Sequence, residues 1–154
     1  MCENNKYAIS IPVEKQLACK KNVSDRAIGY GMPGYTVDGN DPLEVYRVVK
    51  EAADRARRGE GPTLIETVCY RLTAHSSDDD DLVYRTKEEV TEAKKKNDPV
   101  HTFALYLREA GILTDETEQQ LLDEITTIIN EATEYAEQAP YADPEAALRY
   151  VYGE

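Results

Sequence analysis

A stripe of hydrophobic positions with helical spacing follows Asp41. Its members recur at i, i+3, i+4, i+7, i+8 and i+11, and they are Val45, Val48, Val49, Ala52, Ala53 and Ala56. Asp41 can cap the segment, and Pro42 suits the first helical position, where no backbone N–H is needed. The pattern predicts an amphipathic helix that Gly59 and Gly61 bring to an end.

The run from Thr63 to Tyr70 has a different pattern. It is rich in β-branched residues, and a single charged residue interrupts it. This composition is typical of a buried strand in a parallel sheet. A shorter strand is predicted over Tyr35 to Val37, before the turn signal Asp38-Gly39. Strand, helix and strand together make a βαβ unit, which predicts an α/β fold with a parallel sheet.

Short helices are also predicted over Glu14 to Cys19 and Asp25 to Tyr30, and after Arg85 the pattern predicts helices only. These later helices cover Thr86 to Lys96, Asp98 to Gly111, a long segment from Thr114 and a last one from Asp143 through Val151. One face of the long helix is apolar and consists of Leu121, Leu122, Ile125, Ile128, Ile129, Ala132 and Ala136. We therefore expect an α/β region over residues 1–85 and a helical region over 86–154 that covers the sheet or a partner chain.

Composition and charge restrict the function classes. The chain has 154 residues, enough for a domain with its own core, and a net charge of −12, which disfavours nucleic acid and anionic membranes as partners. No apolar run approaches the roughly 20 residues of a membrane span. The three cysteines, Cys2, Cys19 and Cys69, lack the spacing of metal ligands. Reduced thiols in a cytoplasmic protein are the simplest account of them.

Two adjacent amides, Asn4 and Asn5, stand near the start of the sequence. Asparagine is unfavourable inside strands and helices because its side chain competes for nearby backbone groups, so the pair marks the end of an element. An Asn side-chain oxygen is also the kind of ligand that Mg²⁺ takes together with phosphates and waters. An Asx turn leading into a short strand is the alternative interpretation.

A second polar stretch follows the predicted buried strand. His75 stands in a loop at the carboxyl end of that strand, which is where open α/β sheets place ligands. Its imidazole could bind a phosphate or move a proton near neutral pH, or it could simply be solvated. The other histidine, His101, stands in a helical stretch, where we expect a solvated side chain.

The loop after His75 contains four consecutive aspartates, Asp78 to Asp81. These charges repel one another, so the loop alone should be mobile. It lacks the alternating ligands of a calcium loop. We expect its order to come from a cofactor, from a partner chain, or from Arg71 and Arg85, which can pair with the carboxylates.

The stretches Glu3–Ser10 and Tyr70–Arg85 together resemble the alpha subunit of thiamine-diphosphate-dependent 2-oxo acid dehydrogenases, in particular the bacterial branched-chain (2-oxoisovalerate) type. Val37–Pro42 and Gly61–Thr67 are further similar segments. The resemblance runs over essentially the whole chain but corresponds to the C-terminal part of such a subunit, so we expect a fragment that is inactive alone. It implies part of the thiamine-diphosphate-binding fold, with three α/β/α layers and a helical C-terminal region.

The resemblance also implies site residues. The side-chain oxygen of Asn5 and the backbone carbonyl of Tyr7 would bind Mg²⁺, together with an acidic ligand from a Gly-Asp-Gly stretch that this chain lacks. The expected thiamine diphosphate site includes Asn5, Tyr7, Ile9, Arg71 and His75. Lys6 stands where many family members have Gly. His75 would be catalytic and assist acyl transfer to a lipoyl group, and Ser76 matches a serine that a kinase modifies in mitochondrial relatives.

The implied function is part of the decarboxylating component of a 2-oxo acid dehydrogenase complex. The implied partners are a beta subunit in an α2β2 heterotetramer, a lipoyl acyltransferase and a branched-chain 2-oxo acid. A pyruvate or acetoin dehydrogenase alpha subunit is one alternative. A non-catalytic acidic interaction module, with the aspartate loop and the helical tail as docking surfaces, is another.

Overall fold

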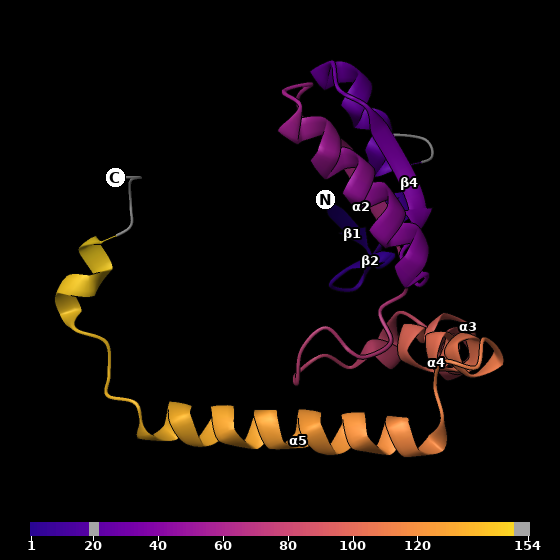
Figure 1. The fold of residues 1–154 in the computed structure, drawn as a ribbon. Helices are drawn as coiled ribbons and strands as arrows, with labels where there is room; N and C mark the ends of the chain where they lie inside the picture. The colour runs from indigo at the N-terminus through magenta and orange to yellow at the C-terminus, as the bar shows by residue number, and fades with distance from the viewer. Residues whose placement is uncertain (19–21, 150–154) are drawn as a thin grey trace. The chain divides into compact units, whose positions relative to one another are not determined.

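The computed structural model describes residues 1–18 and 22–149. They form two compact units, Met1–Glu109 and Ala110–Glu154. The first unit contains the sheet and most of the side chains discussed below. Figure 1 shows the first unit in colours that run from indigo through purple and magenta to salmon, and the long helix of the second unit in orange.

The sheet has three parallel strands in the order β1-β5-β4. These are β1 (Cys2–Asn4), β4 (Gly34–Asp38) and β5 (Leu64–Val68). Cys2 is paired with Glu66 on one side of β5, and Thr36 is paired with Glu66 on the other. The predicted parallel sheet and βαβ unit are confirmed, with β5 somewhat shorter than the apolar run that predicted it.

Helix α2 (Pro42–Arg57) covers one face of the sheet (Figure 1). The Asp41 side chain caps it by accepting hydrogen bonds from the backbone N–H of Leu43 (2.9 Å) and Glu44 (3.2 Å). The buried side chains between helix and sheet are Val37, Val48 and Ile65, with Val45 and Ala52 against them. Val45, Val48 and Ala52 of the predicted apolar stripe thus contact the sheet, whereas Val49 and Ala56 are exposed.

A 3₁₀ helix, η1 (Val23–Tyr30), covers the opposite face. The prediction placed a helix from Asp25 to Tyr30, but the segment begins two residues earlier and is wound more tightly. Gly34 lets it approach β4, because a Cβ at that position would lie only 2.4 Å from the backbone oxygen of Ser24. The three layers are therefore α2, the sheet and η1, in agreement with the expected α/β fold.

A small hairpin and a short helix connect β1 to η1. Strands β2 (Tyr7–Ala8) and β3 (Ile11–Pro12) are antiparallel, and α1 (Val13–Gln16) follows them directly. The helix predicted over Glu14 to Cys19 is therefore shorter and begins one residue earlier. Cys19 itself lies outside the described residues.

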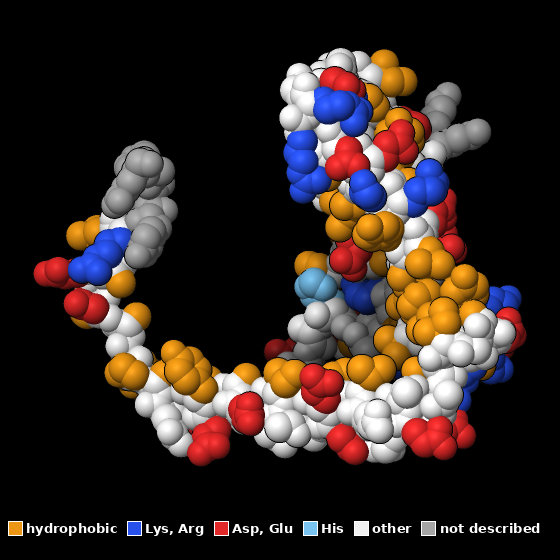
Figure 2. Space-filling view, in the orientation of Figure 1, with side chains coloured by type: hydrophobic (Ala, Val, Ile, Leu, Met, Phe, Trp, Pro, Cys, Tyr) orange, Lys and Arg blue, Asp and Glu red, His pale blue; other side chains and the backbone are white. Residues whose placement is uncertain are grey.

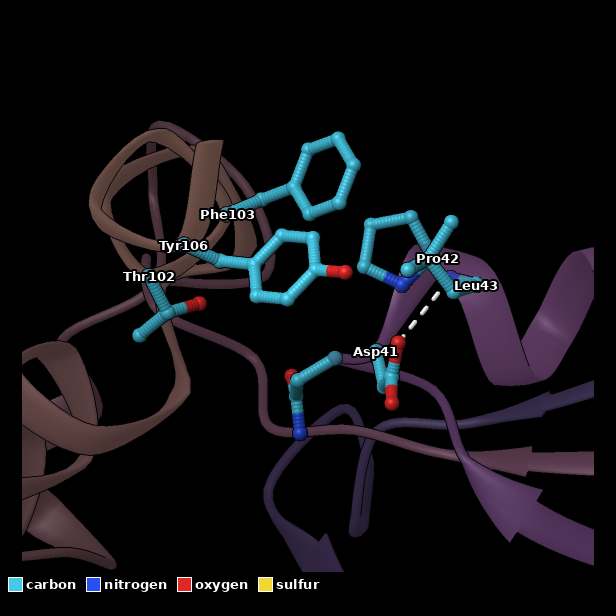
Figure 3. A pocket seen from close by; sticks show the side chains of 7 residues that line it. Asp41, Pro42, Leu43, Thr102, Phe103 and Tyr106 are labelled. Atoms are coloured by element: carbon cyan, nitrogen blue, oxygen red, sulfur yellow. Dashed lines mark hydrogen bonds between the residues drawn. The ribbon is translucent and has the colours of Figure 1, made fainter. Parts of the chain in front are cut away.

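Two further helices belong to the first unit: α3 (Lys87–Asn97) and α4 (Pro99–Glu109). A pocket of about 210 Å³ lies between α4 and the start of α2, and Figure 3 shows Phe103 and Tyr106 directed toward Pro42 across it. The expected boundary after residue 85 therefore marks a change from α/β to helical secondary structure. The boundary between the two compact units lies later, after Glu109.

The second unit is formed by α5 (Asp115–Gln138) and the 3₁₀ helix η3 (Pro144–Leu148). The predicted helix from Asp143 is therefore a 3₁₀ turn, and Val151 lies outside the described residues. Figure 2 shows hydrophobic side chains along one side of α5 and acidic ones along the other. The large apolar side chains of this face are 50–58% exposed: Leu121, Leu122, Ile125, Ile128 and Ile129. Among the described residues, no helix combines the length and the apolar character that crossing a membrane would require.

Candidate functional site

The three parallel strands end at one edge of the sheet, and the polar segments that follow them meet there. The pairing of β1 with β5 continues past both strands. The backbone N–H of Cys69 donates to the carbonyl of Asn4 (2.9 Å), and that of Arg71 donates to the carbonyl of Asn5 (3.2 Å). Asn5 and Arg71, which are far apart in the sequence, are therefore neighbours.

The Asn-Asn pair forms a double Asx turn. Oδ1 of Asn4 accepts from the backbone N–H of Lys6 (3.1 Å), and Oδ1 of Asn5 accepts from that of Tyr7 (3.2 Å). Lys6, which stands between Asn5 and Tyr7, has φ = 75°, the left-handed conformation that glycine adopts most easily. The Asx turn that the sequence suggested is present, and the Asn5 oxygen retains a second lone pair for a metal ion.

The hairpin directs the Tyr7 carbonyl outward. Tyr7 is opposite Pro12, and the neighbouring pair is joined by a hydrogen bond from the N–H of Val13 to the carbonyl of Lys6 (2.9 Å). Because hydrogen-bonded and non-hydrogen-bonded pairs alternate in an antiparallel ladder, the peptide groups of Tyr7 point away from Pro12. Ile9 stands in the tight turn, with φ = 56° and 57% exposure. A left-handed β-branched residue is strained, and such strain is common at functional sites.

Two guanidinium groups lie close to the Tyr7 ring. The central carbon of Arg71 is 5.4 Å from the ring centre and that of Arg85 is 5.6 Å away. The ring also contacts Tyr70 edge-on, with 6.1 Å between centres, and Tyr84 at 5.7 Å. The turn after β1 is thus packed against residues that precede and follow the aspartate loop.

Glu89 of α3 joins this cluster. Its Oε1 accepts a hydrogen bond from the hydroxyl of Tyr7 and another from that of Tyr70, both at 2.7 Å. Burial, followed by the Glu89 hydrogen bond, raises the pKa of the Tyr7 phenol well above its usual value. The hydrogen bonds from Tyr70 and then Tyr7 hold the pKa of Glu89 below its usual value. The carboxylate is therefore charged and both phenols are protonated near neutral pH.

Asp79 organises the base of the His75 loop. Its Oδ2 accepts from the backbone N–H of His75 (2.8 Å) and from the hydroxyl of Tyr84 (2.5 Å). The Tyr84 hydroxyl in turn accepts from Arg71 (2.5 Å), whose Nη2 is 3.9 Å from Asp79. The Tyr84 hydrogen bond, followed by that from His75, lowers the pKa of Asp79. Nε of Arg71 is buried and lacks a hydrogen-bond partner among the described residues.

Arg85 holds the other end of the loop. It donates to Asp81 through Nη2 (2.5 Å) and Nε (2.9 Å), and to the backbone carbonyls of Arg71 (2.5 Å) and Thr73 (2.7 Å). Asp80 caps the 3₁₀ turn η2 (Asp81–Val83). The expected pairing of loop carboxylates with Arg71 and Arg85 is confirmed: Arg71 pairs with Asp79, and Arg85 pairs with Asp81.

The structure brings Asn5, Tyr7 and Arg71 together and links His75 to them through Asp79 and Tyr84. The side chains of His75 and Ser76 are exposed. Ile9 stands in the turn between β2 and β3, and His101 stands on α4.

The residues present suit part of a magnesium site. Asn5 and Tyr7 offer two neutral oxygens, which Mg²⁺ accepts alongside phosphate oxygens and waters. Within residues 1–18 and 22–149, no group of three or more His, Cys, Asp or Glu side chains is placed to hold a metal ion. A cavity of about 190 Å³ borders Asn4, Asn5, Tyr7 and Ala8. The donors thus fit the group that the resemblance implies, but they do not complete its coordination.

Glu66 also belongs to this network, because its Oε1 accepts a hydrogen bond from Nδ2 of Asn4 (2.7 Å). Sequence reasoning did not single out three members of the network: Glu66, Tyr84 and Glu89. Signals for the first two were present. Glu66 is the single charge in the buried strand, and Tyr84-Arg85 repeats the dipeptide Tyr70-Arg71. Glu89 is one of several acids at the start of a polar helix, so its position in the sequence does not distinguish it.

Comparison with known proteins gives consistent matches. The chain is 71% identical over 152 residues to the 2-oxoisovalerate dehydrogenase subunit alpha of Bacillus subtilis (strain 168), covering 99% of this chain and 46% of that protein. It is 42% identical to the 3-methyl-2-oxobutanoate dehydrogenase subunit alpha of Mycobacterium tuberculosis (strain ATCC 25618 / H37Rv), covering 99% and 41%. It is 39% identical to the pyruvate dehydrogenase E1 component subunit alpha of Bacillus subtilis (strain 168), covering 97% and 40%.

The chain spans slightly less than half the length of these curated relatives. Residues 1–145, which include the Asn-Asn turn, the βαβ unit and the aspartate loop, match the family described as dehydrogenase E1 component. Since that match covers nearly the whole sequence, this chain belongs to the dehydrogenase E1 component family.

Proposed function

We propose that this chain provides the diphosphate end of a thiamine diphosphate and Mg²⁺ site in the decarboxylating component of a 2-oxo acid dehydrogenase complex. The observation that carries the proposal is the turn from Asn4 to Tyr7. It stands at the carboxyl edge of a parallel sheet, where this fold class binds ligands, and it offers an amide and a peptide oxygen.

Asn5 and Tyr7 bind the metal through Oδ1 and the backbone carbonyl, and an acidic ligand from elsewhere in the enzyme completes the coordination. When bound, thiamine diphosphate supplies the electron sink for decarboxylation. The chain's own contribution is to hold the diphosphate and its metal at this edge. Because its two neutral donors leave the coordination incomplete, we expect the chain alone to be inactive.

Arg71 and His75 are the other two residues that we assign to the diphosphate end of the site. Nε of Arg71 is buried without a hydrogen-bond partner in the part of the chain that the structure describes, and the guanidinium lies against Tyr7, so it adds positive charge beside the diphosphate. His75 stands exposed at the base of a loop that Asp79 fixes through its backbone. An exposed imidazole on a fixed backbone can donate a proton to the lipoyl sulfur that is released as a thiolate when the other sulfur of the disulfide takes up the acyl group.

The partners are a beta subunit, in an α2β2 heterotetramer, and the acyltransferase of the complex. The apolar face of α5 supports a partner chain, because its large side chains remain half exposed. The free thiols of Cys2 and Cys69 suit a cytoplasmic protein.

Branched-chain 2-oxo acids are the proposed substrates, since the relative with 71% identity is named for 2-oxoisovalerate. Pyruvate is the second candidate, supported by the relative with 39% identity over 97% of the chain. The test is turnover of 3-methyl-2-oxobutanoate and of pyruvate by the assembled enzyme that contains this chain. We expect the higher kcat/KM for 3-methyl-2-oxobutanoate, whereas a higher value for pyruvate would contradict the branched-chain assignment.

A further inference from the structure

The one charged residue in the middle strand of the sheet is buried. Glu66 of β5 is 1% exposed and faces η1, on the opposite side of the sheet from the apolar core. Burying a carboxylate is costly unless hydrogen-bond donors surround it. The Glu66 side chain therefore requires an explanation beyond packing.

Three groups donate to this carboxylate. Oε1 accepts from Nδ2 of Asn4 at 2.7 Å, and Oε2 accepts from the backbone N–H of Ser24 at 3.0 Å and the hydroxyl of Thr36 at 3.2 Å. Burial raises the pKa of Glu66, but these hydrogen bonds outweigh it and hold the pKa below the usual value. Glu66 is thus ionised and can only accept hydrogen bonds.

The contact with Asn4 extends into the Asn-Asn turn. Because Nδ2 of Asn4 donates to Glu66, its Oδ1 faces the other way and accepts from the backbone N–H of Lys6 (3.1 Å). Lys6 is the residue held at φ = 75°, immediately between the two oxygens assigned to the metal. A continuous chain of hydrogen bonds thus runs from the buried carboxylate to the residue that joins Asn5 to Tyr7.

We propose that Glu66 is a positioning residue for the metal site: it orients the Asn4 amide, which fixes the left-handed Lys6 and so aims the oxygens of Asn5 and Tyr7. The inference rests on the proposed function of those two residues. Asn4, the first amide of the pair, is accordingly a connecting residue and does not bind the metal.

Glu66→Gln tests the inference with little change in shape. A Gln side chain can accept on one side only, so its NH₂ group must face either Ser24 N–H or the Asn4 amide. If it faces Asn4, that amide turns over and presents its own NH₂ to the Lys6 N–H. In the assembled enzyme that contains this chain, we expect Mg²⁺ affinity in the presence of thiamine diphosphate to fall about 10- to 100-fold, as is typical of outer-shell partners.

A second substitution should restore the pairing of hydrogen-bond donors with acceptors between positions 4 and 66. In Asn4→Asp combined with Glu66→Gln, the Gln NH₂ donates to one Asp oxygen, the other Asp oxygen accepts from Lys6, and the Gln oxygen still accepts from Ser24. The net charge of the pair is unchanged. We expect the double variant to recover most of the Mg²⁺ affinity, whereas Asn4→Asp alone places two carboxylates together and should not show normal affinity.

Hydrogen exchange of the Lys6 amide provides a readout that needs no cofactor. In the 154-residue chain we expect Glu66→Gln to speed this exchange and the double variant to slow it again. Thr36→Val is the matched control: it removes another donor to Glu66 and lowers stability, but it leaves the Asn4 contact and should change neither Lys6 exchange nor Mg²⁺ affinity beyond about twofold.

Unchanged Lys6 exchange in Glu66→Gln, or a double variant as impaired as the single one in both readouts, would overturn the inference. Failure of the proposed function would look different. In that case Asn5→Ala would leave Mg²⁺ affinity unchanged, while the Lys6 amide would still respond to Glu66.

Discussion

Arg85 and Asp81 form an ion pair, four residues apart, in which the arginine side chain is completely buried and the N···O distance is 2.5 Å. The same guanidinium binds the backbone carbonyls of Arg71 and Thr73. Arg85 therefore closes the aspartate loop onto the segment that leaves β5. Repulsion within the aspartate run is offset where two of its members reach an arginine.

This pair gives the first prediction. Asp81→Asn leaves the buried guanidinium without its counter-charge, so unfolding free energy should fall by about 1.5–3 kcal/mol, as for hydrogen bonds to charged groups. Denaturant unfolding of the chain measures the change. Asp78→Asn is the control, because that residue is exposed, and it should stay within about 0.5 kcal/mol of wild type. Equal effects of the two substitutions would contradict the role of the pair.

The second prediction concerns alkaline pH. The folded pKa of Tyr7 is raised above its ordinary value of 10.0, so the folded state binds this proton more tightly than the unfolded chain does. The resulting stability is fully present below pH 10.0 and is lost as pH rises toward the folded pKa. Thermal unfolding at pH 8 to 11 should show Tm declining above about pH 10.

Tyr7→Phe separates this effect from general alkaline denaturation. The variant has no phenol to titrate, so its Tm should be lower at pH 8 but should decline less steeply above about pH 10. Tyr135→Phe is a suitable control, because that tyrosine is exposed on α5 and should leave the pH profile unchanged. If Tm falls with pH in parallel for wild type and Tyr7→Phe, Tyr7 does not contribute to the loss of stability at alkaline pH.

The third prediction concerns Asn5 in the assembled enzyme. Asn5→Ala removes a proposed metal oxygen and the acceptor for Tyr7 N–H, so Mg²⁺ affinity measured with thiamine diphosphate should fall at least about 10- to 100-fold. Asn5→Asp retains an oxygen at the same place and should retain binding. If both variants bind Mg²⁺ like wild type, Asn5 is only a turn residue.

The fourth prediction concerns His75. If its imidazole serves acyl transfer, His75→Ala should impair transfer to the lipoyl group about 10²–10⁴-fold more than decarboxylation measured with an artificial electron acceptor. His101→Ala, the other histidine, should leave both rates unchanged. Equal losses in the two assays would restrict His75 to cofactor binding, and normal rates in both would make it a solvated residue.

The sequence by itself determined the local elements. The stripe from Val45 to Ala56 specified the helix α2, because helical periodicity and capping depend on residues within a few positions of one another. The β-branched run specified β5 for the same reason, and Thr114 marked the start of α5. The resemblance to the family likewise rested on short contiguous stretches, so the sequence alone could propose Asn5, Tyr7, Ile9, Arg71 and His75 as site residues.

Only the tertiary structure decided what those residues contact. Tyr7 and Glu89 are 82 positions apart, and Asn4 and Glu66 are 62 apart, so no local pattern could pair them. In the sequence Glu66 is an isolated acid in an apolar run; its burial beneath η1 depends on how strands β1, β4 and β5 align. The pairing register decides which donors surround a side chain, and that register is a property of the whole sheet.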